Sequence, residues 1–181
     1  DVDKSVTFKR NSYNNLSREV AIENIPTYHV ATAGTLSSLI SEEEKYTITE
    51  MKVTGYLDGD DIRLLRKMFG GTEFNETERG KLITLDLSEA TIVEGGREYY
   101  TLGTTKYTTS NNIVGDNMFR QCNKLSEIIL PNNATSIGNN AFSSTKLTSV
   151  TIGDEAKTIG ESAFYECSKL CIVDMGKSIT S

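Results

Sequence analysis

The sequence of 181 residues has no tryptophan, one histidine (His29), two prolines and three cysteines. So few histidines and cysteines leave no ligand set at metal-site spacing, and we expect no metal and no other cofactor. Lysine and arginine total 19 against 25 acidic residues, a net charge of -6, which argues against nucleic acid or an anionic membrane surface as partner. No apolar run approaches the ~20 residues of a membrane span, and the polar start Asp1–Lys4 is not a secretory signal. The chain is therefore expected to be either cytosolic or an already processed secreted chain.

What the sequence does contain is a repeated six-residue word, apolar-x-x-apolar-x-apolar. Its five copies begin at Ile48, Leu82, Leu125, Leu147 and Leu170. The word is typical of the strand of a leucine-rich repeat, whose units stack because one unit cannot bury its own apolar face. We therefore predict an α/β repeat fold. It is a leucine-rich-repeat solenoid with a parallel sheet on one face and short helices and turns on the other.

The repeat is most regular in the C-terminal half. Phe119 and Phe142 are 23 residues apart, and Phe142 and Phe164 are 22 apart. Each unit predicts a short strand, a turn with glycine, a helical turn that carries the phenylalanine inward, and the strand of the six-residue word. The same count from Met175 places the next isoleucine just beyond Ser181, so we expect the array to continue past this sequence.

Upstream, the first two words are separated by a predicted helix with Asp60 or Asp61 as its N-cap and Gly70–Gly71 as its stop. Its apolar face consists of Ile62, Leu65 and Phe69.

The N-terminal segment lacks a clear period. We divide the chain into a cap or linker, 1–40, and the solenoid, 41–181. A short amphipathic helix is predicted within Ala33–Ile40, and Val2, Val6 and Phe8 are spaced as in a strand.

Residues 94–112 are an insertion into the repeat pattern and predict a β-hairpin that turns at Gly103–Thr104. Its arms carry Tyr99, Tyr100 and Tyr107. These rings are candidates to stack on a sugar or to anchor a protein. The alternative is that they pack on one another across the strands.

Several motifs resemble those of the BspA-like leucine-rich-repeat surface proteins of bacteria. They are Ile137–Phe142, Ile159–Phe164, Leu130–Pro131, and the Cys-x-x-Leu pairs at Cys122 and Cys167. The resemblance covers the chain from about Ala33 onward. It implies export to the cell surface or periplasm and a role in adhesion or protein binding, and it brings no catalytic residues.

The cysteines are not expected to form disulfides. Cys122 and Cys167 occupy equivalent places two repeats apart, roughly 10 Å at the spacing of stacked strands, which is too far for a bridge. Together with Cys171 they are interpreted as buried or half-buried apolar residues.

The variable positions of the words alternate with the buried ones and predict one continuous outward sheet face. We define this face by ten residues: Glu50, Lys52, Thr84, Asp86, Glu127, Ile129, Ser149, Thr151, Ile172 and Asp174. Four carboxylates against one lysine suit a basic or hydroxyl-rich ligand. The alternative is that these side chains only keep an exposed sheet soluble.

Two further motifs favour structural interpretations. Residues 58–61, with the sequence Asp-Gly-Asp-Asp, lack the downstream bidentate glutamate of a calcium loop and fit a turn and helix cap. His29 has no serine or cysteine at catalytic spacing, so we do not expect an enzyme.

The sequence thus predicts a non-catalytic extracellular recognition module for adhesion or protein binding. The partner is a host extracellular protein or another surface protein. The alternatives are a carbohydrate-binding surface component and a passive structural spacer.

Overall fold

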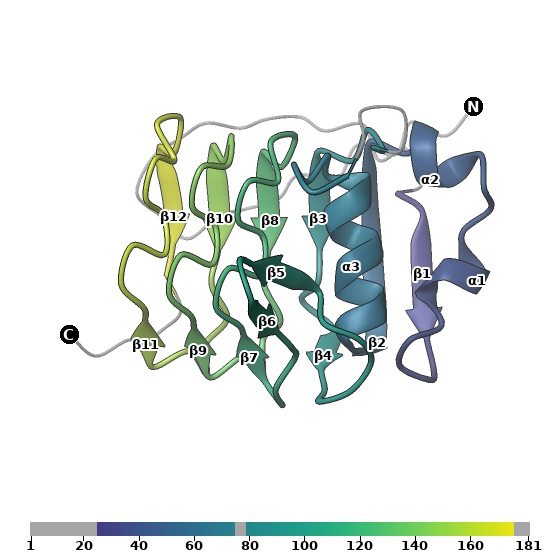
Figure 1. Ribbon diagram of the computed structural model, residues 1–181, viewed down its shortest axis with the longest axis horizontal. Coiled ribbons are helices and arrows are strands. Elements are labelled where there is room, and N and C mark those ends of the chain that lie inside the picture. Colours follow the sequence, from purple (N-terminus) through teal and green to yellow (C-terminus); the bar gives the residue numbers. More distant parts are fainter. Residues whose placement is uncertain (1–24, 75–78, 176–181) are drawn as a thin grey trace, which may run out of the picture.

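The computed structural model describes residues 25–74 and 79–175, which form a solenoid of stacked parallel strands (Figure 1). Its main sheet has the order β1 (Thr27–Val30), β2 (Glu50–Leu57), β3 (Thr84–Asp86), β8 (Glu127–Ile129), β10 (Ser149–Thr151), β12 (Ile172–Asp174). The remaining strand of this sheet, β4 (Ala90–Ile92), pairs with the last three residues of β2. A smaller corner sheet contains β7 (Ile113–Val114), β9 (Ser136–Ile137) and β11 (Thr158–Ile159). The predicted leucine-rich-repeat fold is confirmed.

Each six-residue word forms a strand of the main sheet, and the middle apolar residues are in register. This column consists of Met51, Leu85, Ile128, Val150 and Val173. The first four are buried, since strand alternation points them into the solenoid, whereas Val173 on β12 is 43% exposed.

A second column, of phenylalanine rings, fills the opposite side of the core. Phe69 meets Phe119 edge to face at a centroid distance of 6.1 Å. Phe119, Phe142 and Phe164 then stack at 5.6 and 5.4 Å. The helical turns therefore carry their phenylalanines inward, as predicted.

Backbone hydrogen bonds between successive units run in opposite directions on two sides of the array. In the phenylalanine turns, Phe119 N donates to the Ala141 carbonyl and Phe142 N to the Ala163 carbonyl, so each unit donates to the following one. At the corner, Gly138 N donates to the Val114 carbonyl of the preceding unit.

The turns depend on left-handed residues at equivalent positions. Asn117, Asn140 and Ser162 have φ of 57°, 53° and 55°. Asparagine adopts this conformation more readily than serine, whose side chain offers less local compensation for the strain.

Helix α3 (Gly59–Met68) covers the side opposite the main sheet. The predicted N-cap at Asp60 or Asp61 is wrong, because Asp58 caps the helix by accepting from Asp60 N at 2.9 Å. Asp61 instead completes a capping box by accepting from Asp58 N at 3.1 Å. Gly70 ends the helix as predicted, with a φ of 72°. Ile62, Leu65 and Phe69 are buried.

At the N-terminal end, β1 pairs with β2, so residues 27–30 extend the main sheet. Two four-residue helices follow, α1 (Leu36–Leu39) inside the predicted helix and α2 (Glu44–Thr47), which was not predicted. The spacing of Val2, Val6 and Phe8 falls outside the described residues.

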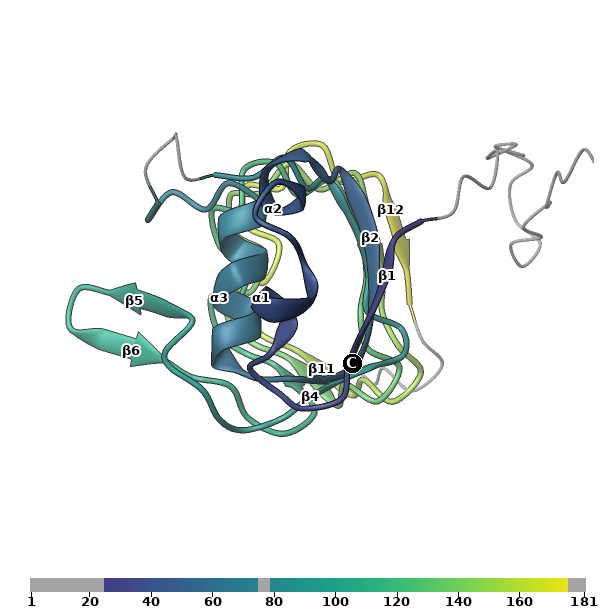
Figure 2. The ribbon, with the colours of Figure 1, turned by 90° about the vertical axis from the view of Figure 1, so that its right-hand side faces the viewer.

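The insertion contains the antiparallel strands β5 (Tyr100–Leu102) and β6 (Thr105–Tyr107). Gly103 lies at the turn with a φ of 61°. The hairpin projects from the side of the solenoid opposite the main sheet (Figure 2).

Candidate functional site

The outward sheet face is the largest ordered array of polar side chains predicted from the sequence, and the strand register brings its ten residues together. One row consists of Glu50, Thr84, Glu127, Ser149 and Ile172. The adjacent row consists of Lys52, Asp86, Ile129, Thr151 and Asp174. Neighbours in a row are separated by the ~4.8 Å between paired strands, so the rows form a continuous strip across five strands.

The residues of this face range from half-buried to exposed. Glu50, Ile129, Ile172 and Asp174 are exposed. The hydroxyl residues Thr84, Ser149 and Thr151 are half-buried between them. Helix α3 and the hairpin lie on the other side of the solenoid, so neither covers the face (Figure 2).

Lys52 contributes the positive charge of the face, and neighbouring carboxylates hold it. Its Nζ lies 2.5 Å from Glu89 Oε1 and 3.7 Å from Asp86 Oδ2. The hydrogen bond to Glu89 is the main cause of the raised pKa of Lys52, which therefore stays charged. Two carboxylates therefore offset the charge of this ammonium group.

The hairpin tyrosines are a correction to the sequence prediction. Tyr99 and Tyr100 are only 1% and 5% exposed, so their rings cannot serve as an open stacking platform. The Tyr99 hydroxyl donates to the Asp116 carbonyl at 2.7 Å. Tyr107 is half-buried, and its ring lies 6.1 Å from that of Tyr100. The tyrosines pack across the hairpin base and into the core, which is the alternative interpretation.

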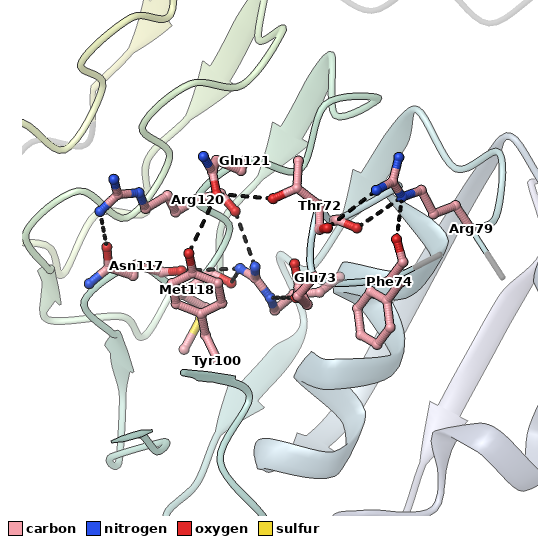
Figure 3. Close-up of polar contacts among 11 residues, drawn as sticks. Thr72, Glu73, Phe74, Arg79, Tyr100, Asn117, Met118, Arg120 and Gln121 are labelled. Atoms are coloured by element: carbon pink, nitrogen blue, oxygen red, sulfur yellow. Dashed lines mark hydrogen bonds and ion pairs between the residues drawn. The ribbon is translucent and has the colours of Figure 1, made fainter. Parts of the chain in front are cut away.

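Tyr100 also contacts the buried Arg66 of α3, which sequence reasoning missed. Figure 3 shows residues that surround this arginine, among them Glu73, Tyr100 and Met118. The Arg66 guanidinium lies 4.3 Å from the centroid of that ring, and its Nε lies 2.6 Å from Glu73 Oε1. Its remaining nitrogens donate to the carbonyls of Asn117, Met118 and Arg120 at 2.8–3.1 Å. The signal in the sequence was its position four residues after Ile62, on the inward face of the helix.

This buried cluster is structural rather than reactive. Cys122, also buried, has a pKa raised to about 12 by burial, so its thiol stays protonated at neutral pH. With every Arg66 nitrogen bound to protein oxygens, the guanidinium is not available to a ligand.

The structure describes the cysteines as unbridged. Cys122 and Cys167 are buried, but the prediction for Cys171 is wrong because this residue is exposed. It lies just before β12 begins, so strand alternation does not direct it into the core.

The remaining motifs form no catalytic or metal-binding constellation within residues 25–74 and 79–175. His29 is exposed, and its Nδ1 lies 2.9 Å from the Thr54 hydroxyl on the neighbouring strand. Among the described residues, no group of three or more histidine, cysteine or acidic side chains has the geometry of a metal site. Asp58 and Asp61 are instead engaged by backbone N–H groups, including that of Gly34 at 2.6 Å from Asp61 Oδ2.

In the described part of the chain, no helix is long and apolar enough to cross a membrane.

Comparisons with known proteins give a family match for the repeats. No curated protein matches the sequence. The solved structure of a leucine rich cell surface protein from Faecalibacterium prausnitzii A2-165 aligns with 17% identity and a TM-score of 0.37. The alignment covers 93% of this chain and 46% of that one, so the present chain spans less than half of that protein. Residues 98–181 match the BspA type Leucine rich repeat region, with six copies.

Proposed function

We propose that this chain is a non-catalytic recognition module that binds a protein partner through the outward sheet face, outside the cell or at its surface. The observation that carries the proposal is the register of the ten side chains, which forms one strip across five strands. Within residues 25–74 and 79–175, no helix covers this strip (Figure 2). The match of residues 98–181 to the BspA type Leucine rich repeat region supports the extracellular setting and the recognition role.

The burial of Tyr99 and Tyr100 favours the sheet face over the hairpin as the site. A protein partner suits the strip better than a sugar, because the strip is extended and mixes charged, hydroxyl and apolar groups rather than presenting open aromatic rings.

A binding screen against immobilised extracellular-matrix proteins and a glycan array tests the proposal. The face variant Thr84→Arg with Thr151→Arg places two long side chains on the strip. Its matched control, Thr101→Arg with Thr105→Arg, makes the same changes on the exposed hairpin strands. We expect saturable binding to a protein that the face variant loses by at least about tenfold and the control retains.

Loss in the hairpin variant alone would move the site to the hairpin. Binding to glycans but to no protein would favour the carbohydrate alternative. Absence of binding on both panels, with all variants folded by circular dichroism, would contradict recognition and leave the structural spacer.

A further inference from the structure

The core columns of the solenoid end in exposed side chains at the β12 end of the array (Figure 1). In the preceding unit the equivalent side chains are buried, because they have neighbours on both sides. Three of them, Val150, Ile152 and Ile137, are followed in the next unit by Val173, Met175 and Ile159, which are 43%, 52% and 37% exposed. The end of the array is therefore an apolar surface that matches the cross-section of one repeat.

The backbone of the last phenylalanine turn lacks the acceptors that the preceding turn has. In the preceding turn three N–H groups donate to carbonyls of the next unit: Asn140 to Glu161 at 3.0 Å, Phe142 to Ala163 at 2.8 Å, and Ser144 to Tyr165 at 2.8 Å. The equivalent N–H groups belong to Ser162, Phe164 and Glu166, and within residues 25–74 and 79–175 no following unit accepts from them. The turn thus presents three hydrogen-bond donors at the open end.

In the corner sheet the open end has the opposite polarity. Gly138 N donates to the Val114 carbonyl and Gly160 N to the Ile137 carbonyl, each at 2.7 Å. The next carbonyl of this series is that of Ile159, and in the described part of the chain no following unit donates to it. One side of the end therefore offers donors, and the corner offers an acceptor.

This polarity decides which molecule can cover the end. A second copy related by a two-fold axis that superimposes the two phenylalanine turns would place N–H groups against N–H groups. The opposite end of a second copy does not fit either, because it presents β1, α1 and α2 instead of a phenylalanine turn (Figure 1). A further repeat of the same kind fits, since its turn offers carbonyls and its corner offers an N–H group.

We infer that the β12 end of the array is an interface for a further repeat unit of the same construction, which continues the chain and stacks head to tail. Such a unit would cover the exposed apolar columns and accept from the three free N–H groups. It would also add a strand to the main sheet. This surface differs from the outward sheet face, so the inference holds whether or not that face binds a protein.

The test extends the whole chain after Ser181 by a copy of residues 159–181, which places isoleucine where the repeat spacing requires it. The matched control has the same extension with Phe164→Ser, Leu170→Ser and Val173→Ser in the copy only. This control keeps the length of the extension and removes its apolar packing. Amide hydrogen exchange, followed by NMR, is measured in the original chain and in both extended chains.

We expect the amide hydrogens of Ser162, Phe164 and Glu166 to exchange at least about tenfold more slowly in the extended chain, because they gain acceptors. The control extension should change these rates by less than about twofold. The Phe142 amide, which already has an acceptor, should change little in either extended chain.

Unchanged exchange in the extended chain would overturn the inference, and so would equal slowing in the control, because any attached chain would then shield the end. Sedimentation of the original chain tests the other occupant. Self-association that Val173→Lys abolishes would show that a second copy covers the end, and it would also overturn the inference. A monomer whose three amides respond only to the apolar extension would support it.

Discussion

The two halves of the solenoid build the same sheet from very different connections. Between Phe119 and Phe164, successive units differ by one residue in length and repeat the same turn, strand and hydrogen bonds. Between β2 and β8, the strands are joined first by the ten-residue helix α3 and then by a segment that includes the hairpin. The sheet nevertheless stays in register throughout. The six-residue word therefore suffices to place a strand, and the opposite side of the core is free to vary.

The irregular half has to be fastened to the regular one by contacts that do not repeat. Arg66 performs this role by binding three carbonyls of the first regular turn. Phe69 continues the ring column at the same junction, although its contact with Phe119 is edge to face rather than stacked. Repeating units thus share many equivalent contacts, and the junction depends on a few particular ones.

The largest expected difference is in the reaction rates of two cysteine thiols, Cys122 and Cys171. Cys122 lies at the junction, where its backbone pairs with that of Gly71, and Cys171 lies exposed in the last described repeat. Burial raises the pKa of Cys122 to about 12, so very little of it is thiolate at pH 8, and burial also keeps the reagent away from its sulfur. With maleimide at pH 8, followed by mass spectrometry of peptides, the exposed Cys171 should react at least about a hundredfold faster than Cys122. Comparable rates without denaturant would mean that the junction opens readily, and both thiols should react alike in urea.

Removal of a ring from the middle of the phenylalanine column should cause the largest loss of stability. Phe142 stacks on both neighbours and is fully buried, so Phe142→Ala should lower the free energy of unfolding by about 3–5 kcal/mol in urea titrations. Phe164→Ala is the matched control, and it should cost less because that ring is half-buried. An equal or larger loss at Phe164 would contradict a column that gains stability from neighbours on both sides.

The junction itself is tested by Arg66→Met, which keeps a long side chain and removes the guanidinium. We expect a loss of about 3 kcal/mol, because three carbonyls lose a donor and Glu73 loses its ion pair. Arg63→Met, on the same helix, removes a half-buried arginine that lies over the Phe74 ring and should cost under about 1 kcal/mol. A neutral or stabilising Arg66→Met would show that the cost of burying the charge exceeds what its contacts return.

The smallest effect should come from making the repeats more alike. Ser162 has the left-handed conformation that asparagine adopts at positions 117 and 140. Ser162→Asn should therefore raise the free energy of unfolding by about 0.5 kcal/mol. Ser162→Ala should lower it, since alanine has no polar side chain to compensate the strain. A loss in both variants would mean that the serine hydroxyl itself stabilises this turn.

The repeating parts of the molecule could be predicted from the sequence, because alternation along a strand and stacking between units are local rules applied many times. The five strands, the inward phenylalanines and the ten outward residues all follow from them. Arg66 could not be predicted in the same way, since its carbonyl partners lie 51 to 54 residues away. The prediction that the Tyr99 and Tyr100 rings are open to a ligand was wrong for a similar reason. Their hairpin was evident, but only its packing against the first regular turn decides that the rings are buried.

The opposed hydrogen bonds of the two sides have an electrical consequence. In an α-helix the peptide dipoles align and leave about half a unit charge at each end. Here the phenylalanine turns point their N–H groups toward later units and the corner points them toward earlier ones, so the two sets of dipoles oppose each other along the array. Each added unit therefore contributes less to an axial dipole than the same hydrogen bonds would if they all pointed one way. A solenoid of this kind can lengthen while its backbone field grows more slowly than that of a helix of equal length.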